Sequence, residues 1–140
     1  MTGLKGRGSV LGAVAAGGVL GSEARYALSS LQAPGAEFPW LTLVVNASGC
    51  LLIGVLMTVV LELTARRRLV RPFLGVGLLG GYTTFSTYAV DVHQMLVDGR
   101  YAVAATYLAA TPVTALAAVW TGAALTRAGL RRRKLGGGGS

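Results

Sequence analysis

The sequence has only one cysteine and one histidine among its 140 residues. A single cysteine, Cys50, excludes an intrachain disulfide, and its place in an apolar tract favours a small packing residue. A single histidine, His93, provides no metal-binding cluster. The sequence also has no nucleophile–base pair, metal-ligand spacing or phosphate-binding loop, and these absences argue against an enzyme.

Charged residues are also few, at 13% of the sequence against about 25% in typical soluble domains. Hydrophobic residues make up 53% of the chain. The net charge of +8 does not indicate a nucleic-acid partner, because basic residues do not alternate with aromatic ones as in single-strand binders. The basic residues stand at the ends of apolar tracts, where they would meet lipid headgroups. The sequence therefore predicts a membrane protein surrounded mostly by lipid.

Four segments are long and apolar enough for a membrane-spanning helix, which needs roughly 20 residues. They cover about 10–31, 40–63, 72–97 and 101–125. We therefore expect an all-α integral membrane protein whose residues 1–130 form four transmembrane helices joined by short turns. A basic tail follows at 131–134, and residues 135–140, "LGGGGS", are expected to be an added flexible linker.

The positive charges are distributed unevenly between the two predicted sides of the membrane. With four spans, eleven of the 13 basic residues fall on the side of the termini and the middle loop. They are Lys5, Arg7, Arg66, Arg67, Arg68, Arg71, Arg127, Arg131, Arg132, Arg133 and Lys134. Arg25 and Arg100 fall on the other side. The positive-inside rule then predicts that both termini are cytoplasmic.

The stretch "GLLGGYTTFSTYAVD" (77–91) places glycines and hydroxyl residues inside the third predicted helix. Glycine costs about 1 kcal/mol relative to alanine in a helix interior, so the adjacent Gly80 and Gly81 predict a break in the membrane. A break frees carbonyl groups that can bind a small cation, and amide and hydroxyl groups that can bind an anion. The alternative is a continuous helix in which the glycines pack and the threonines bond to their own helix.

Asn46 lies near the middle of the second segment, among small residues that permit close helix packing. In hydrocarbon its amide must face protein or a water-filled path, so Asn46 either joins helices or lines such a path. Phe85 and Tyr88 are three residues apart and would share one helix face. The positive edges of their rings can stabilise an anion, although aromatic residues in membrane helices usually serve packing.

The fourth segment adds Tyr107, Thr111 and Thr114 on one helical stripe, and Pro112 is expected to kink this helix. Together with Asn46 and the predicted break, these hydroxyls make a polar track. The track has no carboxylate at its centre, so it favours anions over cations. Arg25 either anchors the first segment at the interface or draws anions to the mouth of the track.

The stretch "GGYTTFSTY" (80–88) resembles the signature of the Fluc, or CrcB, fluoride channels. "VNASGCLLIG" and "GSEARYALS" resemble second- and first-span motifs of the same family, and the resemblance covers nearly all of residues 10–126. It implies an antiparallel, dual-topology dimer with two fluoride pores in the bacterial inner membrane. The subunit would export fluoride from the cytoplasm and relieve fluoride toxicity.

The resemblance also implies roles for individual residues. A structural Na⁺ at the dimer centre would be held by the main-chain carbonyls of Gly80 and Thr83, and Arg25 would lie in the vestibule. The fluoride pore would be lined by Asn46, Phe85, Tyr88, Thr84, Ser86, Thr87, Tyr107 and Thr111. Two residues depart from the family pattern. Tyr88 replaces a phenylalanine, and its hydroxyl could join the path or point away from it. Ala115 replaces a hydroxyl residue that often continues the track.

The charge bias makes a further prediction about the partner. An antiparallel homodimer needs a chain that inserts in both orientations, whereas this chain has a strong bias toward one. We therefore expect a homologous partner of opposite bias, with a dual-topology homodimer as the rival.

Two other functions fit a small four-span protein. A proton-coupled multidrug exporter would need a membrane-embedded carboxylate, for which Glu23 is the candidate in the first segment. A non-conducting assembly subunit would use the polar track only to join helices.

Overall fold

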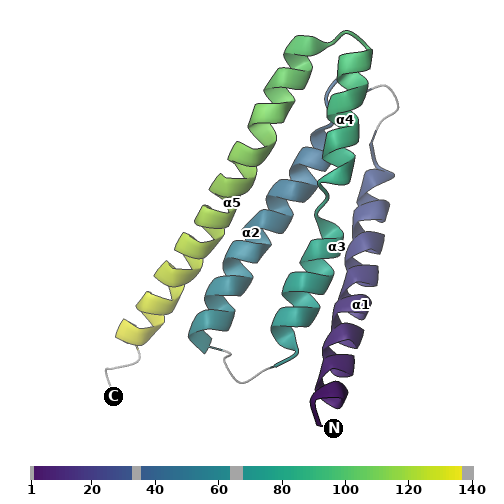
Figure 1. Ribbon diagram of the computed structural model, residues 1–140. Coiled ribbons are helices and arrows are strands. Elements are labelled where there is room, and N and C mark those ends of the chain that lie inside the picture. Colours follow the sequence, from purple (N-terminus) through teal and green to yellow (C-terminus); the bar gives the residue numbers. More distant parts are fainter. Residues whose placement is uncertain (1, 33–35, 64–67, 137–140) are drawn as a thin grey trace.

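The computed structural model of the chain describes residues 2–32, 36–63 and 68–136, and every regular element within them is a helix. The elements are α1 (Thr2–Ser29), α2 (Trp40–Leu63), η1 (Arg71–Leu79), α3 (Gly80–Tyr82), α4 (Ser86–Val97) and α5 (Tyr101–Gly136). Figure 1 shows an elongated bundle in which α1 begins and α5 ends at the same end. The predicted all-α fold is confirmed for the described residues.

The third helical segment is interrupted, as the glycines and hydroxyl residues predicted. It starts as a π-helix, η1, with Pro72 in its first turn, and continues through α3 to Tyr82. Thr83 then has φ −78° and ψ 155°, which is extended backbone, and the helix resumes at Ser86. We call residues 83–85 the break. It separates an inner half, η1 and α3, from an outer half, α4.

Close helix contacts depend on glycine. α1 packs against η1 and α3, while α2 packs against α5. A Cβ added at Gly21 would overlap the main chain of η1, and one added at Gly81 would overlap the main chain of α1. Gly54 and Gly122 bring α2 and α5 together in the same way. Main chains that approach this closely are typical of helix packing in membranes, where small residues form the interfaces.

Two of the described helices are long and apolar enough to cross a membrane, over Trp40–Val60 and Tyr101–Arg132. In their most apolar windows only 28% and 17% of the residues, respectively, are buried. Large apolar side chains such as Leu116 and Trp120 are more than 70% exposed, at 72% and 73%. Exposed apolar surface on this scale fits a protein surrounded by lipid rather than water. Four membrane spans remain a prediction, because α1 and the interrupted third segment are not among these two helices.

The α4–α5 connection at "VDGR" (97–100) is a tight turn, in agreement with the short turns expected between the helices. Gly99 has a positive φ of 73°, the one such residue among those described. The N–H of Gly99 donates to the carbonyl of Leu96, and that of Arg100 donates to the carbonyl of Met95. These two bonds form a Schellman motif, which ends α4 and turns the chain back into α5.

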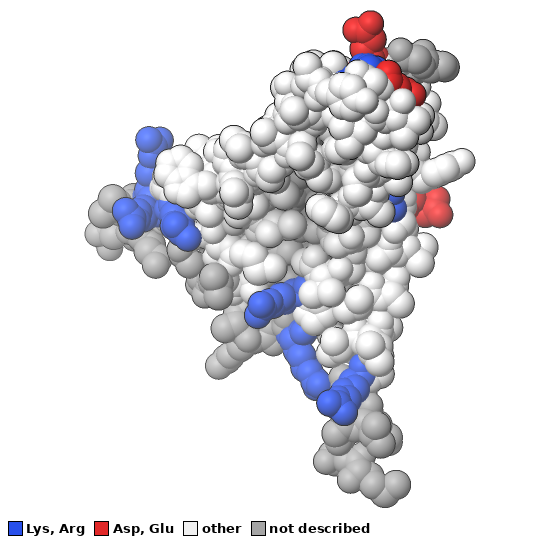
Figure 2. Space-filling view, turned by 45° about the horizontal axis from the view of Figure 1, so that its top comes forward, with Lys and Arg blue, Asp and Glu red and all other residues white. Residues whose placement is uncertain are grey.

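Figure 2 shows basic side chains mainly toward one end of the molecule, acidic side chains at the other end and one flank, and a broad uncharged surface between them. The helix positions agree, because Arg7 lies near the start of α1, Arg71 starts η1 and Arg132 lies near the end of α5. Arg66 and Arg67 lie outside the described residues, as does the end of the predicted linker, 137–140. α5 continues beyond 125 through the predicted basic tail.

Candidate ion-binding cavity at the helix break

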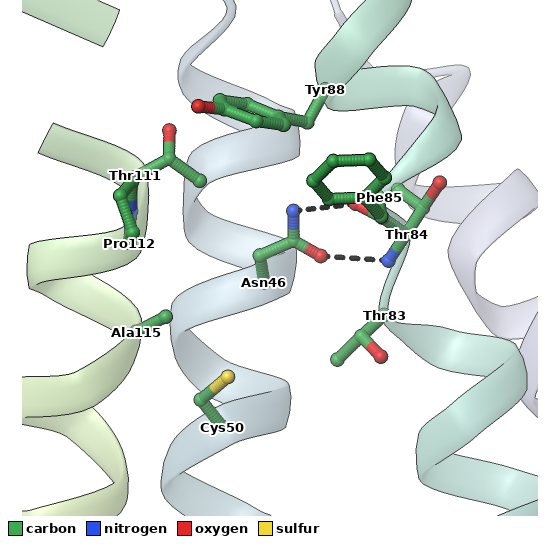
Figure 3. Close-up of a pocket in the computed structure, with 9 residues that line it drawn as sticks. All are labelled: Asn46, Cys50, Thr83, Thr84, Phe85, Tyr88, Thr111, Pro112 and Ala115. Atoms are coloured by element: carbon green, nitrogen blue, oxygen red, sulfur yellow. Dashed lines mark hydrogen bonds between the residues drawn. The ribbon is translucent and has the colours of Figure 1, made fainter. Parts of the chain in front are cut away.

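A cavity of about 400 Å³ lies beside the break, between α2, α4 and α5. Six residues that the sequence singled out for the site are brought together around it (Figure 3). They are Asn46, Thr83, Thr84, Phe85, Tyr88 and Thr111. Cys50, Pro112 and Ala115 complete the lining. Among the described residues, no acidic or basic side chain lines the cavity, so its polar contribution comes from amide, hydroxyl and thiol groups.

Asn46 joins α2 to the break through two reciprocal hydrogen bonds. Its Nδ2 donates to the main-chain carbonyl of Thr84 at 2.9 Å, and its Oδ1 accepts from the N–H of Thr84 at 2.8 Å. Exchanging the amide oxygen and nitrogen would break both bonds, so the amide orientation is set by its partner. Nδ2 has a second hydrogen that neither of these bonds uses. Asn46 therefore joins helices and still has a donor to offer in the cavity that it lines.

Two main-chain N–H groups at the break bond to side chains instead of continuing the helix. In a continuous helix the N–H of Thr84 would donate to the carbonyl of Gly80, four residues earlier. It donates to Asn46 instead. The N–H of Thr87 would reach the carbonyl of Thr83 but donates to Thr84 Oγ1 at 3.1 Å. The carbonyls of Gly80 and Thr83 therefore lose the donors that a continuous helix would give them.

These two carbonyls are the ones that the sequence resemblance implied as Na⁺ ligands. Carbonyl oxygens without donors suit a hard cation, which prefers oxygen ligands. A Cβ added at Gly80 would meet nothing within 4 Å, so the space beside it is open. Among the described residues, no three His, Cys, Asp or Glu side chains form a metal-binding group. The residues present therefore fit a cation held by main-chain oxygens.

The Thr84 side chain caps the outer half of the third segment. Besides accepting from the Thr87 N–H, its Oγ1 donates to Thr87 Oγ1 at 3.0 Å and lies 3.2 Å from Ser86 Oγ. Phe85 is the N-cap residue of α4 and has no side-chain cap bond, so the threonine one position earlier supplies the capping oxygen to the Thr87 N–H. Ser86 and Thr87 take part in this cap and do not line the cavity. Of the three predicted pore hydroxyls in this stretch, only Thr84 reaches it.

Phe85, the last residue of the break, and Tyr88, in the first turn of α4, have ring centroids 5.6 Å apart. Phe85 is 79% exposed, whereas Tyr88 is 8% exposed. The Tyr88 hydroxyl donates to the main-chain carbonyl of Leu108 in α5 at 2.9 Å. Of the two alternatives for the Tyr88 hydroxyl, joining the path or pointing away from it, the structure has the second. The hydroxyl donates to α5, and the ring lines the cavity.

Thr111 differs from other helical threonines. Thr58, Thr106, Thr121 and Thr126 each donate to the carbonyl four residues earlier in their own helix. Thr111 Oγ1 is buried and has no hydrogen-bond partner among the described residues. A buried hydroxyl without a partner costs about 1–3 kcal/mol, so it indicates that a ligand or water normally meets it.

Tyr107 does not line the cavity. It is fully buried, and its hydroxyl donates to Asp91 Oδ2 at 3.3 Å. Its ring packs against those of Tyr88 and Phe38, at centroid distances of 5.3 and 5.2 Å. Thr111 lies at the cavity and Tyr107 behind it, so the two do not form one continuous lining. Asp91 in α4 can reach Tyr107 in α5 because these two helices pack against each other.

Arg25 lies on α1 and does not line the cavity. Its Nε donates to the main-chain carbonyl of Gly81 at 3.2 Å, near the end of α3. A cation at the end of a helix is stabilised by the partial negative charge of the last carbonyls. Glu23, the carboxylate that an exporter would need, is exposed on α1 and also lies outside the cavity lining.

The small residues around Asn46 allow α2 to approach the break. A Cβ added at Gly49 would overlap the Thr83 side chain and lie 3.1 Å from the Tyr82 ring. Ser48 Oγ lies 3.0 Å from the Tyr82 hydroxyl, within hydrogen-bond distance. Cys50 and Pro112 also line the cavity. Sequence reasoning did not place them there, because neither an unpaired cysteine nor a helix kink distinguishes a cavity lining from a packing position.

Comparisons with known proteins agree with the motif. A family model described as "CrcB-like protein, Camphor Resistance (CrcB)" matches residues 12–123. The chain is 49% identical over 134 residues to "Fluoride-specific ion channel FluC 1" of Streptomyces coelicolor, covering 95% of the chain and 87% of that protein. It is 48% identical to "Fluoride-specific ion channel FluC 2" of Nocardia farcinica, covering 89% and 91%. It is 42% identical to "Fluoride-specific ion channel FluC" of Agrobacterium fabrum, covering 81% and 93%.

These relatives are named as ion channels, which confirms the prediction that the chain is not an enzyme. The family match covers most of the chain, including the break, the residues around Asn46 and Thr111. By sequence and by the motif at its break, the chain belongs to the CrcB family.

Proposed function

We propose that the chain is a subunit of a fluoride channel that exports fluoride from the cytoplasm and so relieves its toxicity. The observation that carries this proposal is the Thr111 hydroxyl, which is buried without a partner among the described residues, in a cavity that Asn46 also lines. The unused Nδ2 hydrogen of Asn46 and the Thr111 hydroxyl are neutral donors. Neutral donors without a carboxylate favour a small anion over a cation.

The aromatic residues would let the anion pass without holding it tightly. A ring edge carries partial positive charge and attracts an anion more weakly than a charged side chain does. Conduction requires binding that is strong enough to replace water and weak enough to permit release. Phe85 and Tyr88 line the cavity together with Asn46 and Thr111, where such an intermediate interaction is useful.

The pathway would be completed by a second subunit in the opposite orientation. Phe85 is 79% exposed although it lines the cavity, and the space beside Gly80 is open. A second Fluc-type subunit that covers this face would enclose the ring. The eleven-to-two distribution of basic residues favours a homologous partner of opposite bias, with both termini of this chain in the cytoplasm and the dimer in the bacterial inner membrane.

Na⁺ would lie at the centre of this dimer. The carbonyls of Gly80 and Thr83, released because Asn46 and Thr84 take the N–H groups that would otherwise bond to them, would hold it. When bound, the ion supplies positive charge that keeps the main-chain oxygens of two broken helices together. The role of this chain is to keep those oxygens free of internal hydrogen bonds.

Fluoride efflux from liposomes that contain the purified chain, measured with a fluoride electrode, tests the proposal. Thr111→Val removes the buried cavity hydroxyl and keeps the shape of the side chain, so we expect it to lower efflux at least tenfold without loss of folded protein. The matched control is Thr121→Val, because Thr121 lies on the same helix, is not part of the cavity lining and bonds to the carbonyl of Ala117 in its own helix. It should leave efflux unchanged.

Efflux that requires co-reconstitution with a homologous subunit would support the heterodimer, and strong efflux from this chain alone would support the homodimer. Equal efflux from the Thr111→Val and wild-type proteins would contradict the assigned cavity. No fluoride efflux in either setting, with chloride or protonated cations transported instead, would contradict the proposed function itself.

A further inference from the structure

Pro112 creates an acceptor without a donor inside α5. In a regular helix the N–H of residue 112 would donate to the carbonyl of Leu108, four residues earlier. Proline has no N–H, so it cannot make this bond. In hydrocarbon an unbonded main-chain carbonyl costs several kcal/mol. The carbonyl of Leu108 therefore needs a donor from outside its own helix.

The Tyr88 hydroxyl is that donor. It comes from α4 and bonds the Leu108 carbonyl at 2.9 Å. In Figure 3 the Tyr88 side chain extends across the cavity toward the helix that carries Thr111 and Pro112. The ring is 8% exposed, so it is held by packing as well as by the hydrogen bond. A phenylalanine at this position, as the family signature has it, could fill the same space but could not bond the carbonyl.

We propose that Tyr88 is a positioning residue whose hydroxyl replaces the N–H that Pro112 lacks. The bond fixes the Tyr88 ring at the cavity and holds α4 against α5. Tyr88 and Pro112 are therefore an energetically coupled pair, because the hydroxyl is needed only while proline occupies position 112. The coupling depends on Tyr88, which this chain has in place of the phenylalanine of the family signature. Its effect on ion flux rests on the proposed function.

A double-mutant cycle with Tyr88→Phe and Pro112→Ala tests the coupling. With proline present, Tyr88→Phe leaves the Leu108 carbonyl without a donor and should lower the melting temperature of the purified protein. With alanine at position 112, the helix supplies its own N–H. The same Tyr88→Phe change should then shift the melting temperature by less than about half as much. Pro112→Leu supplies the same N–H and replaces Pro112→Ala if the alanine variant does not fold.

Tyr101→Phe is the matched control, because it removes a hydroxyl from a ring on α5 that is 67% exposed. It should leave the melting temperature unchanged in both backgrounds. Equal effects of Tyr88→Phe with proline and with alanine at position 112 would overturn the proposal. An unchanged melting temperature after Tyr88→Phe with proline retained would also overturn it.

Fluoride efflux from liposomes provides the second readout. If the hydroxyl positions the ring for conduction, Tyr88→Phe should lower efflux several-fold beside Pro112, and Pro112→Ala should restore most of the loss. If the hydroxyl served stability alone, Tyr88→Phe would lower the melting temperature, but Pro112→Ala would not restore efflux. That result would contradict the positioning role of Tyr88. If wild-type protein carries no fluoride either alone or together with a homologous subunit, the proposed function fails, while the melting-temperature cycle still decides whether Tyr88 and Pro112 are coupled.

Discussion

The inner and outer halves of the third helical segment are built differently. The inner half, η1 and α3, lies against α1 with main chain on main chain, and glycines on both sides make this contact possible. The outer half, α4, is fixed by side-chain hydroxyls, since Thr84 caps its start and Tyr88 bonds to α5. The difference teaches that the inner half is fixed by close main-chain packing, while the break and the outer half present aromatic rings to a cavity.

The largest effect is expected from filling the inner contact. Gly21→Ala places a Cβ against the main chain of η1, which a small side-chain movement cannot relieve. We expect loss of most folded protein, measured by size-exclusion chromatography of detergent extracts, because overpacking alone typically costs about 1–3 kcal/mol. Gly12→Ala is the matched control on α1, since its added Cβ meets nothing within 4 Å. It should be neutral or stabilising by up to about 1 kcal/mol. Equal yields of the two variants would show that folding does not depend on the close contact between Gly21 and η1.

A smaller but more specific effect is expected at the junction of the two halves. Asn46→Ala removes both bonds to Thr84 and releases the Thr84 N–H, which can then return to the Gly80 carbonyl. We expect the Na⁺ concentration for half-maximal stabilisation against heat to rise at least tenfold. Ser48→Ala removes the contact with the Tyr82 hydroxyl and the bond to the Val45 carbonyl in its own helix, but no bond to Thr84. It is the control and should leave this concentration unchanged. If the Na⁺ concentration for half-maximal stabilisation did not change in Asn46→Ala, Asn46 would not be needed to keep the Gly80 carbonyl free for Na⁺.

The smallest effect is expected at the start of the outer half. Thr84→Val removes the cap on the Thr87 N–H and should destabilise the protein by about 1 kcal/mol, as typical for loss of an N-cap. Thr84→Ser retains the oxygen and should retain most of the stability. Thermal unfolding of both variants in the same detergent measures the difference. If serine destabilised the protein and valine did not, methyl packing rather than capping would account for the role of Thr84.

The sequence was most informative where polarity conflicted with an apolar setting. Paired glycines beside a hydroxyl run predicted the break, and Asn46 stood out because an amide in hydrocarbon requires a partner. Both features are local, so they can be recognised without knowing which helices meet. The contact from Thr84 to Asn46 then joins them across 38 positions of the chain.

The directions of individual side chains were not predictable in the same way. Thr84, Ser86 and Thr87 all carry hydroxyl groups, yet Ser86 and Thr87 lie in the first turn of α4 beside the Thr84 cap and do not line the cavity. Tyr107 and Thr111 share a helical stripe, but a long side chain reaches Asp91 whereas a short one stays at the cavity. The hydroxyl of Tyr88 could be assigned only after Leu108 was placed opposite it.

The short length of α4 has a consequence for how the chain enters the membrane. Its 12 residues extend about 18 Å, well below the hydrocarbon thickness of about 30 Å. Alone, α4 would leave the ends of its backbone unsatisfied in lipid. The tight turn at Gly99 places it directly beside α5, whose 36 residues can span the bilayer. Biogenesis should therefore deliver α4 and α5 into lipid as a preformed hairpin rather than one helix after the other.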